Sequence, residues 1–112
     1  MAHEQFMSCI EACVRCAQQC AHCGEACLSE PDVHLMEECI RLDRDCAHIC
    51  WTAAAFMSRG SQFSPDVCQV CAEVCDACAD ECARHQHDHC QRCAEECRAC
   101  AEECRRMAAA MA

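Results

Sequence analysis

The chain has 112 residues and a formal charge of −10 at pH 7, a common size for one compact domain. This charge disfavours nucleic acid and anionic membranes as partners, because both require clustered Lys and Arg. Two glycines and two prolines leave few helix-breaking positions, so we expect a single all-α domain over residues 1–112. Its 19 cysteines are about twice the usual threshold for a cysteine scaffold.

Stop and start signals divide the chain into four predicted helices. Ser29 can cap a helix and Pro31 suits the first turn of a new one, so the first helix should end before this pair. Gly60 is a natural C-terminal stop for the second helix. Asp88 followed by Gln91 is a capping-box pattern for the last. The predicted helices cover residues 3–28, 31–58, 65–84 and 89–109.

The cysteines recur at alternating steps of three and four residues, the spacing of a narrow stripe along one helix face. Because the connections are short, the helices should pack antiparallel, up-down-up-down, as a four-helix bundle with a Cys-lined core. The stripe cysteines are Cys9, Cys13, Cys16, Cys20, Cys23, Cys27, Cys39, Cys46, Cys50, Cys68, Cys71, Cys75, Cys78, Cys82, Cys90, Cys93, Cys97, Cys100 and Cys104.

The ends of the four stripes should gather at two unlike ends of the bundle. Phe6, Met57, Phe63 and Met107 are expected to form an apolar plug at one end. The other end should be an open mouth, rich in metal ligands. Its expected members are Cys27, Met36, His85, His87, His89 and Cys90.

Cysteines at CxxxC spacing hold their Cβ atoms about 5–6 Å apart on one helix face, so their sulfurs could clasp a metal ion. Eight such pairs occur in the sequence. Soft thiolates favour Cu(I), zinc or iron–sulfur clusters. We favour multiple Cu(I) ions for two reasons. Cu(I) can be coordinated by only two or three sulfurs, and an unbroken column of thiols suits many small cations stored in a row. A zinc or cadmium store of metallothionein type remains an alternative, since sulfurs paired across helices could build four-sulfur sites.

Other roles for the cysteines fit the pattern less well. Cys is too small to replace Leu at nearly every core position without voids or an unusually tight bundle. A thiol redox bundle is disfavoured, because the CxxC pairs lie within helices and no βαβ pattern occurs. No secretory signal or apolar stretch of about 18 residues is evident, so we expect a cytoplasmic protein with reduced thiols.

Three alternating histidines and one acidic residue stand out beside the thiols. His85, His87 and His89 should pass Cu(I) inward at the mouth together with the Met36 thioether; a solvated loop is the alternative. Asp43 occupies a stripe position, where a buried carboxylate is costly without a partner. It should bind metal near the mouth, pair with a histidine such as His85, or turn toward solvent.

The chain resembles the cytosolic copper storage proteins, a bacterial family of cysteine-lined four-helix bundles. The resemblance rests on the CxxxC and CxxC ladders of all four helices and on the HxHxHC turn at 85–90, and covers essentially the whole chain. It implies a homotetramer whose bundles store many Cu(I) ions on the 19 cysteines. It also implies that copper is received by His85 and His89, with His87 and Asp43 as further candidates. We therefore expect a non-catalytic copper store supplied by a copper carrier or chaperone.

Overall fold

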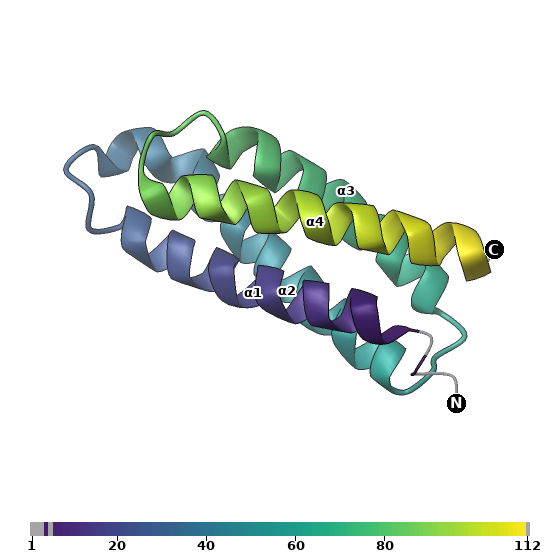
Figure 1. The fold of residues 1–112 in the computed structure, drawn as a ribbon. Helices are drawn as coiled ribbons and strands as arrows, with labels where there is room; N and C mark the ends of the chain where they lie inside the picture. Colours follow the sequence, from purple (N-terminus) through teal and green to yellow (C-terminus); the bar gives the residue numbers. More distant parts are fainter. Residues whose placement is uncertain (1–3, 5, 112) are drawn as a thin grey trace.

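The computed structural model describes residue 4 and residues 6–111. The chain forms an up-down-up-down antiparallel four-helix bundle, as predicted (Figure 1). Helix α1 packs against α2 and α4, and α3 packs against the same two helices. The elements are α1 (Met7–Cys27), η2 (Val33–Met36, a 3₁₀ helix), α2 (Glu37–Ser58), α3 (Ser64–Cys82) and α4 (Asp88–Met111). No helix in the described part is long and apolar enough to cross a membrane.

The second helix begins later than the sequence indicated. A turn and η2 precede α2, which starts at Glu37 rather than at position 31. Side chains of the turn bind across the end of the bundle: Glu30 Oε2 lies 2.7 Å from His89 Nε2, and Asp32 Oδ1 lies 3.3 Å from His87 Nε2. These tertiary contacts outweigh the local serine–proline start signal. The predicted start of the first helix, at position 3, lies outside the described residues.

The expected stop after α2 is present. Gly60 has φ 65°, the left-handed conformation that glycine adopts without a steric penalty. Its N–H donates to Met57 O, and the N–H of Ser61 donates to Phe56 O, each over 3.0 Å. This pair of bonds is a Schellman motif, which satisfies carbonyls that the helix end leaves free.

Gln91 acts differently from the capping-box prediction. Its Nε2 donates to the backbone oxygens of Ala83 and His85, over 3.2 and 2.6 Å. The side chain therefore closes the C-terminal end of α3 and ties the α3–α4 turn to α4. The start of α4 at Asp88 is close to the predicted position all the same.

The core consists mainly of cysteine and alanine. All 19 cysteines are free and at most 1% exposed. The small side chains let the four helices approach closely, giving a bundle of 48 × 18 × 17 Å. The tight bundle, rather than a core with large voids, is thus how the fold accommodates thiols in place of leucines.

α1 begins and α4 ends at the same end of the bundle as the α2–α3 connection (Figure 1). Large apolar side chains close this end. Phe6 and Met57 are fully buried there, and Met107 is half-buried against the core. Phe63 was predicted to join this plug, but its side chain is 54% exposed because it directly precedes α3 in the connection. The plug is therefore smaller than the sequence suggested.

Replacing Gly60 by Ala should destabilise the metal-free protein by about 1–2 kcal/mol, the cost of a left-handed conformation for an L-residue. Urea unfolding under reducing, anaerobic conditions measures this change. Gly24→Ala is the matched control: Gly24 lies inside α1, where a Cβ would meet Asp43 Cβ at an ordinary 3.5 Å. That substitution should be neutral or stabilising. Equal losses in both variants would contradict the prediction.

Candidate metal centre

The sulfurs form one connected column along the bundle axis. Seven of the eight CxxxC pairs have their Sγ atoms 3.9–4.0 Å apart. In the remaining pair, Cys9 and Cys13 each lie 3.7 Å from Cys104. Contacts between helices are as short as 3.4 Å, between Cys39 and Cys82. The predicted stripes therefore meet in the core.

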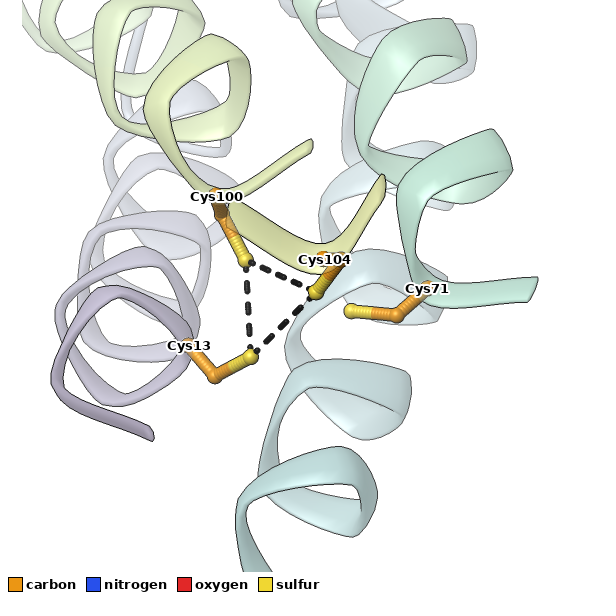
Figure 2. A group of neighbouring side chains, drawn as sticks. All are labelled: Cys13, Cys71, Cys100 and Cys104. Atoms are coloured by element: carbon orange, nitrogen blue, oxygen red, sulfur yellow. Dashed lines mark hydrogen bonds between the residues drawn. The ribbon is translucent and has the colours of Figure 1, made fainter. Parts of the chain in front are cut away.

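The column contains groups of four sulfurs that lie within 4.8 Å of one another. Figure 2 shows one of them, in which Cys13, Cys100 and Cys104 are in mutual contact and Cys71 faces them from α3. The groups include 13/71/100/104, 16/46/50/75, 16/20/46/97, 20/78/93/97 and 23/27/39/90. Four of these share no member, whereas 16/20/46/97 bridges two others. The same thiols could thus serve as a continuous column or as separate four-sulfur sites.

The spacing of the sulfurs suits soft metal ions of low coordination number. With metal–sulfur bonds of about 2.3 Å, two sulfurs of a trigonal site would lie about 4.0 Å apart. The observed separations of 3.4–4.0 Å need only small side-chain rotations to reach that distance. Thiolate is the ligand that selects Cu(I), zinc or iron–sulfur clusters over harder ions.

At the mouth, the thiol of Cys27 is held protonated in the metal-free protein by its buried surroundings, which raise its pKa to about 12. Among the buried residues that the structure describes, no basic side chain is available to stabilise a thiolate. Metal binding must therefore displace protons, so metal uptake is coupled to pH.

His89 is the histidine that faces the thiols. Its Nδ1 lies 3.4 Å from Cys23 Sγ, 3.5 Å from Cys90 Sγ and 4.0 Å from Cys27 Sγ. Its side chain is 12% exposed, so the ring reaches both the core and the surface. The mouth thus combines an imidazole nitrogen with a group of four sulfurs that also includes Cys39.

Glu30 orients this imidazole, a role that the sequence did not reveal. His89 Nε2 donates its hydrogen to Glu30 Oε2 over 2.7 Å. With the proton on Nε2, the Nδ1 lone pair points toward the three sulfurs. A carboxylate behind a metal-binding histidine fixes the ring in this way and increases its basicity.

The other predicted mouth residues occupy different positions. His87 stacks on His89 with ring centroids 5.4 Å apart and lies beside Glu30 and Asp32, outside the thiol group. His85 Nε2 is engaged by Glu81 Oε2 at 2.9 Å. Met36 is fully buried, but the described contacts do not join its sulfur to a thiol. The structure therefore brings only His89 of these residues into contact with the thiols.

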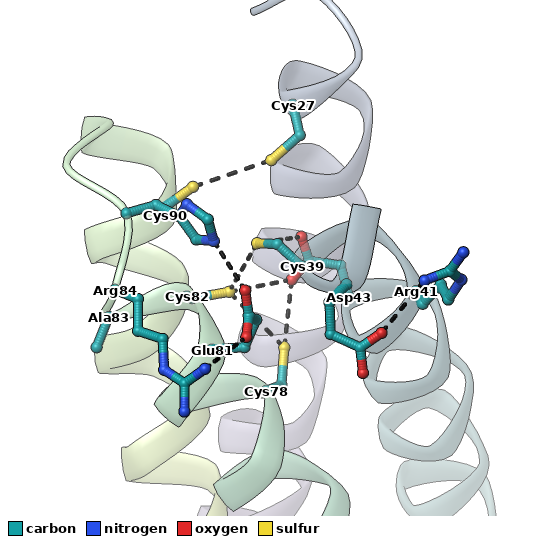
Figure 3. A network of polar contacts seen from close by, with 12 residues as sticks. Cys27, Cys39, Arg41, Asp43, Cys78, Glu81, Cys82, Ala83, Arg84 and Cys90 are labelled. Carbon is teal, nitrogen blue, oxygen red and sulfur yellow. Dashed lines mark hydrogen bonds and ion pairs between the residues drawn. The ribbon is translucent and has the colours of Figure 1, made fainter. Parts of the chain in front are cut away.

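Asp43 is buried among thiols and does not reach solvent or His85, contrary to two of the three expectations. Its Oδ1 accepts hydrogen bonds from Cys78 and Cys93 at 3.2 Å and from Cys82 at 3.4 Å. Figure 3 shows the carboxyl group between α2 and α3, with Cys39 on its other side. Burial raises its pKa to about 9. Asp43 is therefore a neutral acid in the metal-free protein at pH 7.

Comparisons with known proteins agree with this geometry. The sequence model of the family described as "Copper storage protein" matches residues 2–109. The chain belongs to the copper storage protein family. No match was found among curated protein sequences.

Solved structures of copper storage proteins superpose closely on the chain. Copper storage protein 3 from Bacillus subtilis, in its apo form, is 48% identical, with a TM-score of 0.86 over 92% of this chain and 98% of that one. Its Cu(I)-bound form, BsCsp3, is 50% identical, with a TM-score of 0.89 over 92% and 97%. The Streptomyces lividans copper storage protein Ccsp, loaded with 10 copper equivalents, is 49% identical, with a TM-score of 0.91 over 95% and 85%.

Asp43 should make the stability of the metal-free protein depend on pH. Its folded-state pKa of about 9 exceeds the ordinary value near 4, so the stabilisation is complete below pH 4 and is lost as the pH rises toward 9. Between pH 5 and 8, the free energy of unfolding of the wild type should fall as the pH rises. The slope for Asp43→Asn should be shallower by about 1 kcal/mol per pH unit, as measured by anaerobic urea unfolding. Asp45→Asn, an exposed change on the same helix, should follow the wild type. Parallel curves for the wild type and Asp43→Asn would contradict this account.

Proposed function

We propose that this chain is a non-catalytic store that holds many Cu(I) ions on the thiolates of its core. The observation that carries the proposal is the column of 19 buried free thiols, all but Cys68 of which have another thiol sulfur within 4.0 Å. Membership of the copper storage protein family and the copper-loaded structures of relatives support the choice of metal. Zinc or cadmium held in separate four-sulfur sites is the alternative that the geometry also accommodates.

In this proposal all 19 cysteines are storage ligands and His89 receives the metal. The imidazole Nδ1 offers a ligand that needs no deprotonation, while the neighbouring thiols at the mouth still carry protons. Cu(I) bound at Nδ1 then replaces the proton of Cys23 or Cys90, and the proton leaves to solvent. Further thiol exchange along the column moves the ion inward and frees the mouth for the next ion.

The remaining predicted mouth residues would act less directly. His87, Glu30 and Asp32 form a polar rim that surrounds His89. Asp43 would bind Cu(I) as part of the column only after it loses its proton or its thiol partners lose theirs. His85 and Met36 remain candidates for transient ligands, since neither contacts a thiol in the described structure.

We further propose that the protein works as a single domain in the cytoplasm, takes copper from a carrier thiol and assembles as a homotetramer. One relative from Streptomyces lividans, 48% identical, is described as a cytosolic copper storage protein. The side chains of Trp51 and Val70, 45% and 48% exposed, are large apolar groups that such an assembly could cover.

Anaerobic titration with Cu(I) against a competing chelator should show binding of far more than four ions per chain. Four is the number of the described four-sulfur groups that share no member, so zinc-like use of these groups would saturate there. Copper binding should release protons and should weaken as the pH falls, because protons compete for the thiols. Saturation at four or five ions, or preferential retention of zinc, would favour the alternative.

His89→Ala should slow the first phase of Cu(I) uptake from a chelated donor, followed by stopped-flow absorbance of the chelator. His85→Ala is the matched control, because His85 pairs with Glu81 and should leave the rate unchanged. Glu30→Ala, which removes the hydrogen-bond acceptor behind His89, should weaken binding at the mouth by about 10-fold or more. Final capacity should be nearly unchanged in all three variants. A larger effect of His85→Ala than of His89→Ala would contradict this prediction, because it would identify His85 as the histidine that receives copper.

A further inference from the structure

The closed end of the thiol column contains one sulfur from each helix. Met57 Sδ of α2 lies 3.6 Å from Cys68 Sγ of α3. Cys9 of α1 and Cys104 of α4 lie 3.7 Å from each other and are close enough to influence the pKa of Cys68. The four sulfurs are completely shielded from solvent, with exposures of at most 1%. Three thiols and one thioether therefore meet where the column ends.

Met57 lies at a position of α2 where the three- and four-residue spacing predicts a residue of the column. The α2 stripe passes through Cys46, Cys50 and Ala53 before it reaches Met57. A methionine in a core is often only a flexible filler. Here its sulfur is within contact distance of a thiol and accepts the Cys68 S–H, which is more than a filler requires.

We propose that Met57 is a Cu(I) ligand, and that with Cys68 and its thiol neighbours it forms a terminal thioether–thiolate site at the closed end of the column. This inference rests on the proposed copper-storage function and extends it to a residue outside the cysteine set. Thioether sulfur, like thiolate, selects Cu(I) over harder ions. In the binding step Cu(I) replaces the Cys68 proton, which leaves to solvent, and the Met57 lone pair that accepted this proton binds the metal instead.

A neutral ligand suits this end of the bundle. Each additional thiolate on a Cu(I) ion adds a negative charge that the low-dielectric interior stabilises poorly. The thioether adds a sulfur donor without adding charge, at the end where Phe6 excludes water. The 3.6 Å between Met57 Sδ and Cys68 Sγ is close to the separation of about 4.0 Å expected for two sulfurs on a trigonal ion.

A buried hydroxyl also lies near this end of the column. Ser64 lies one helical turn before Cys68, on the same face of α3. Its hydroxyl is buried and has no hydrogen-bond partner among the described residues.

Selenium can report directly on the proposed ligand. The chain is produced with selenomethionine, loaded anaerobically with Cu(I) to saturation, and studied by selenium K-edge EXAFS. Met57 is one of six methionines, so a copper neighbour should appear with a coordination number averaging about one sixth per selenium. Met57→Leu should abolish this copper shell and make one ion per chain easier for a chelator to remove. Met107→Leu, a change at another methionine packed against the core, should retain the shell.

The outcomes separate this inference from the storage function. A fully loaded wild-type protein without a copper neighbour at selenium, or a copper shell that survives in Met57→Leu, overturns the Met57 site while copper storage stands. Failure of the wild-type protein to bind Cu(I) overturns both. The wild-type measurement needs no substitution, so misfolding of a variant cannot produce a false negative. Circular dichroism of each variant checks that the bundle has formed.

Discussion

The close approach of four helices through small side chains is the constraint on which the structure depends. Cysteine and alanine fill nearly all core positions, so the bundle is only 18 × 17 Å across. At that width sulfurs from different helices touch, as Cys39 and Cys82 do at 3.4 Å. A leucine in the column would separate the helices and break the continuity that storage requires.

Because its side chains are small, the core of the metal-free protein contributes only modestly to the free energy of folding. A thiol buries less apolar surface than a leucine, and S–H groups are weak hydrogen-bond donors. Ions that bind the folded state stabilise it by mass action, by about 2.7 kcal/mol when a ligand is at 100 times its Kd. Metal binding therefore adds to the free energy of unfolding of a core that thiol packing alone stabilises only modestly. Asp43 fits this view, because its carboxyl stays neutral and hydrogen-bonded to thiols until metal displaces their protons.

Local periodicity was sufficient to predict the architecture and the thiol column, because the three–four rhythm determines which face of each helix is buried. It could not predict side-chain pairing across the ends of the bundle. His85 and His89 look equivalent in the HxHxHC turn, yet Glu81 engages one and Glu30 orients the other. Glu30 carries no periodic signal, since it lies in a turn whose path is set by these contacts. The late start of α2 and the exposure of Phe63 were missed for the same reason: both depend on the path of a connection between helices, which the local sequence does not determine.

The two ends of the column differ in the charge that their ligands bring. At the mouth, His89 is backed by the carboxylate of Glu30, with Asp32 nearby, so a cation meets negative groups before it meets a thiol. At the closed end the non-thiol sulfur belongs to Met57, which carries no charge and lies away from water. On the proposed function, a cation would be attracted at the mouth and held by soft donors at the closed end. On the same proposal, release of copper to a carrier would reverse the exchanges by which the ion entered, and the ion would leave at His89.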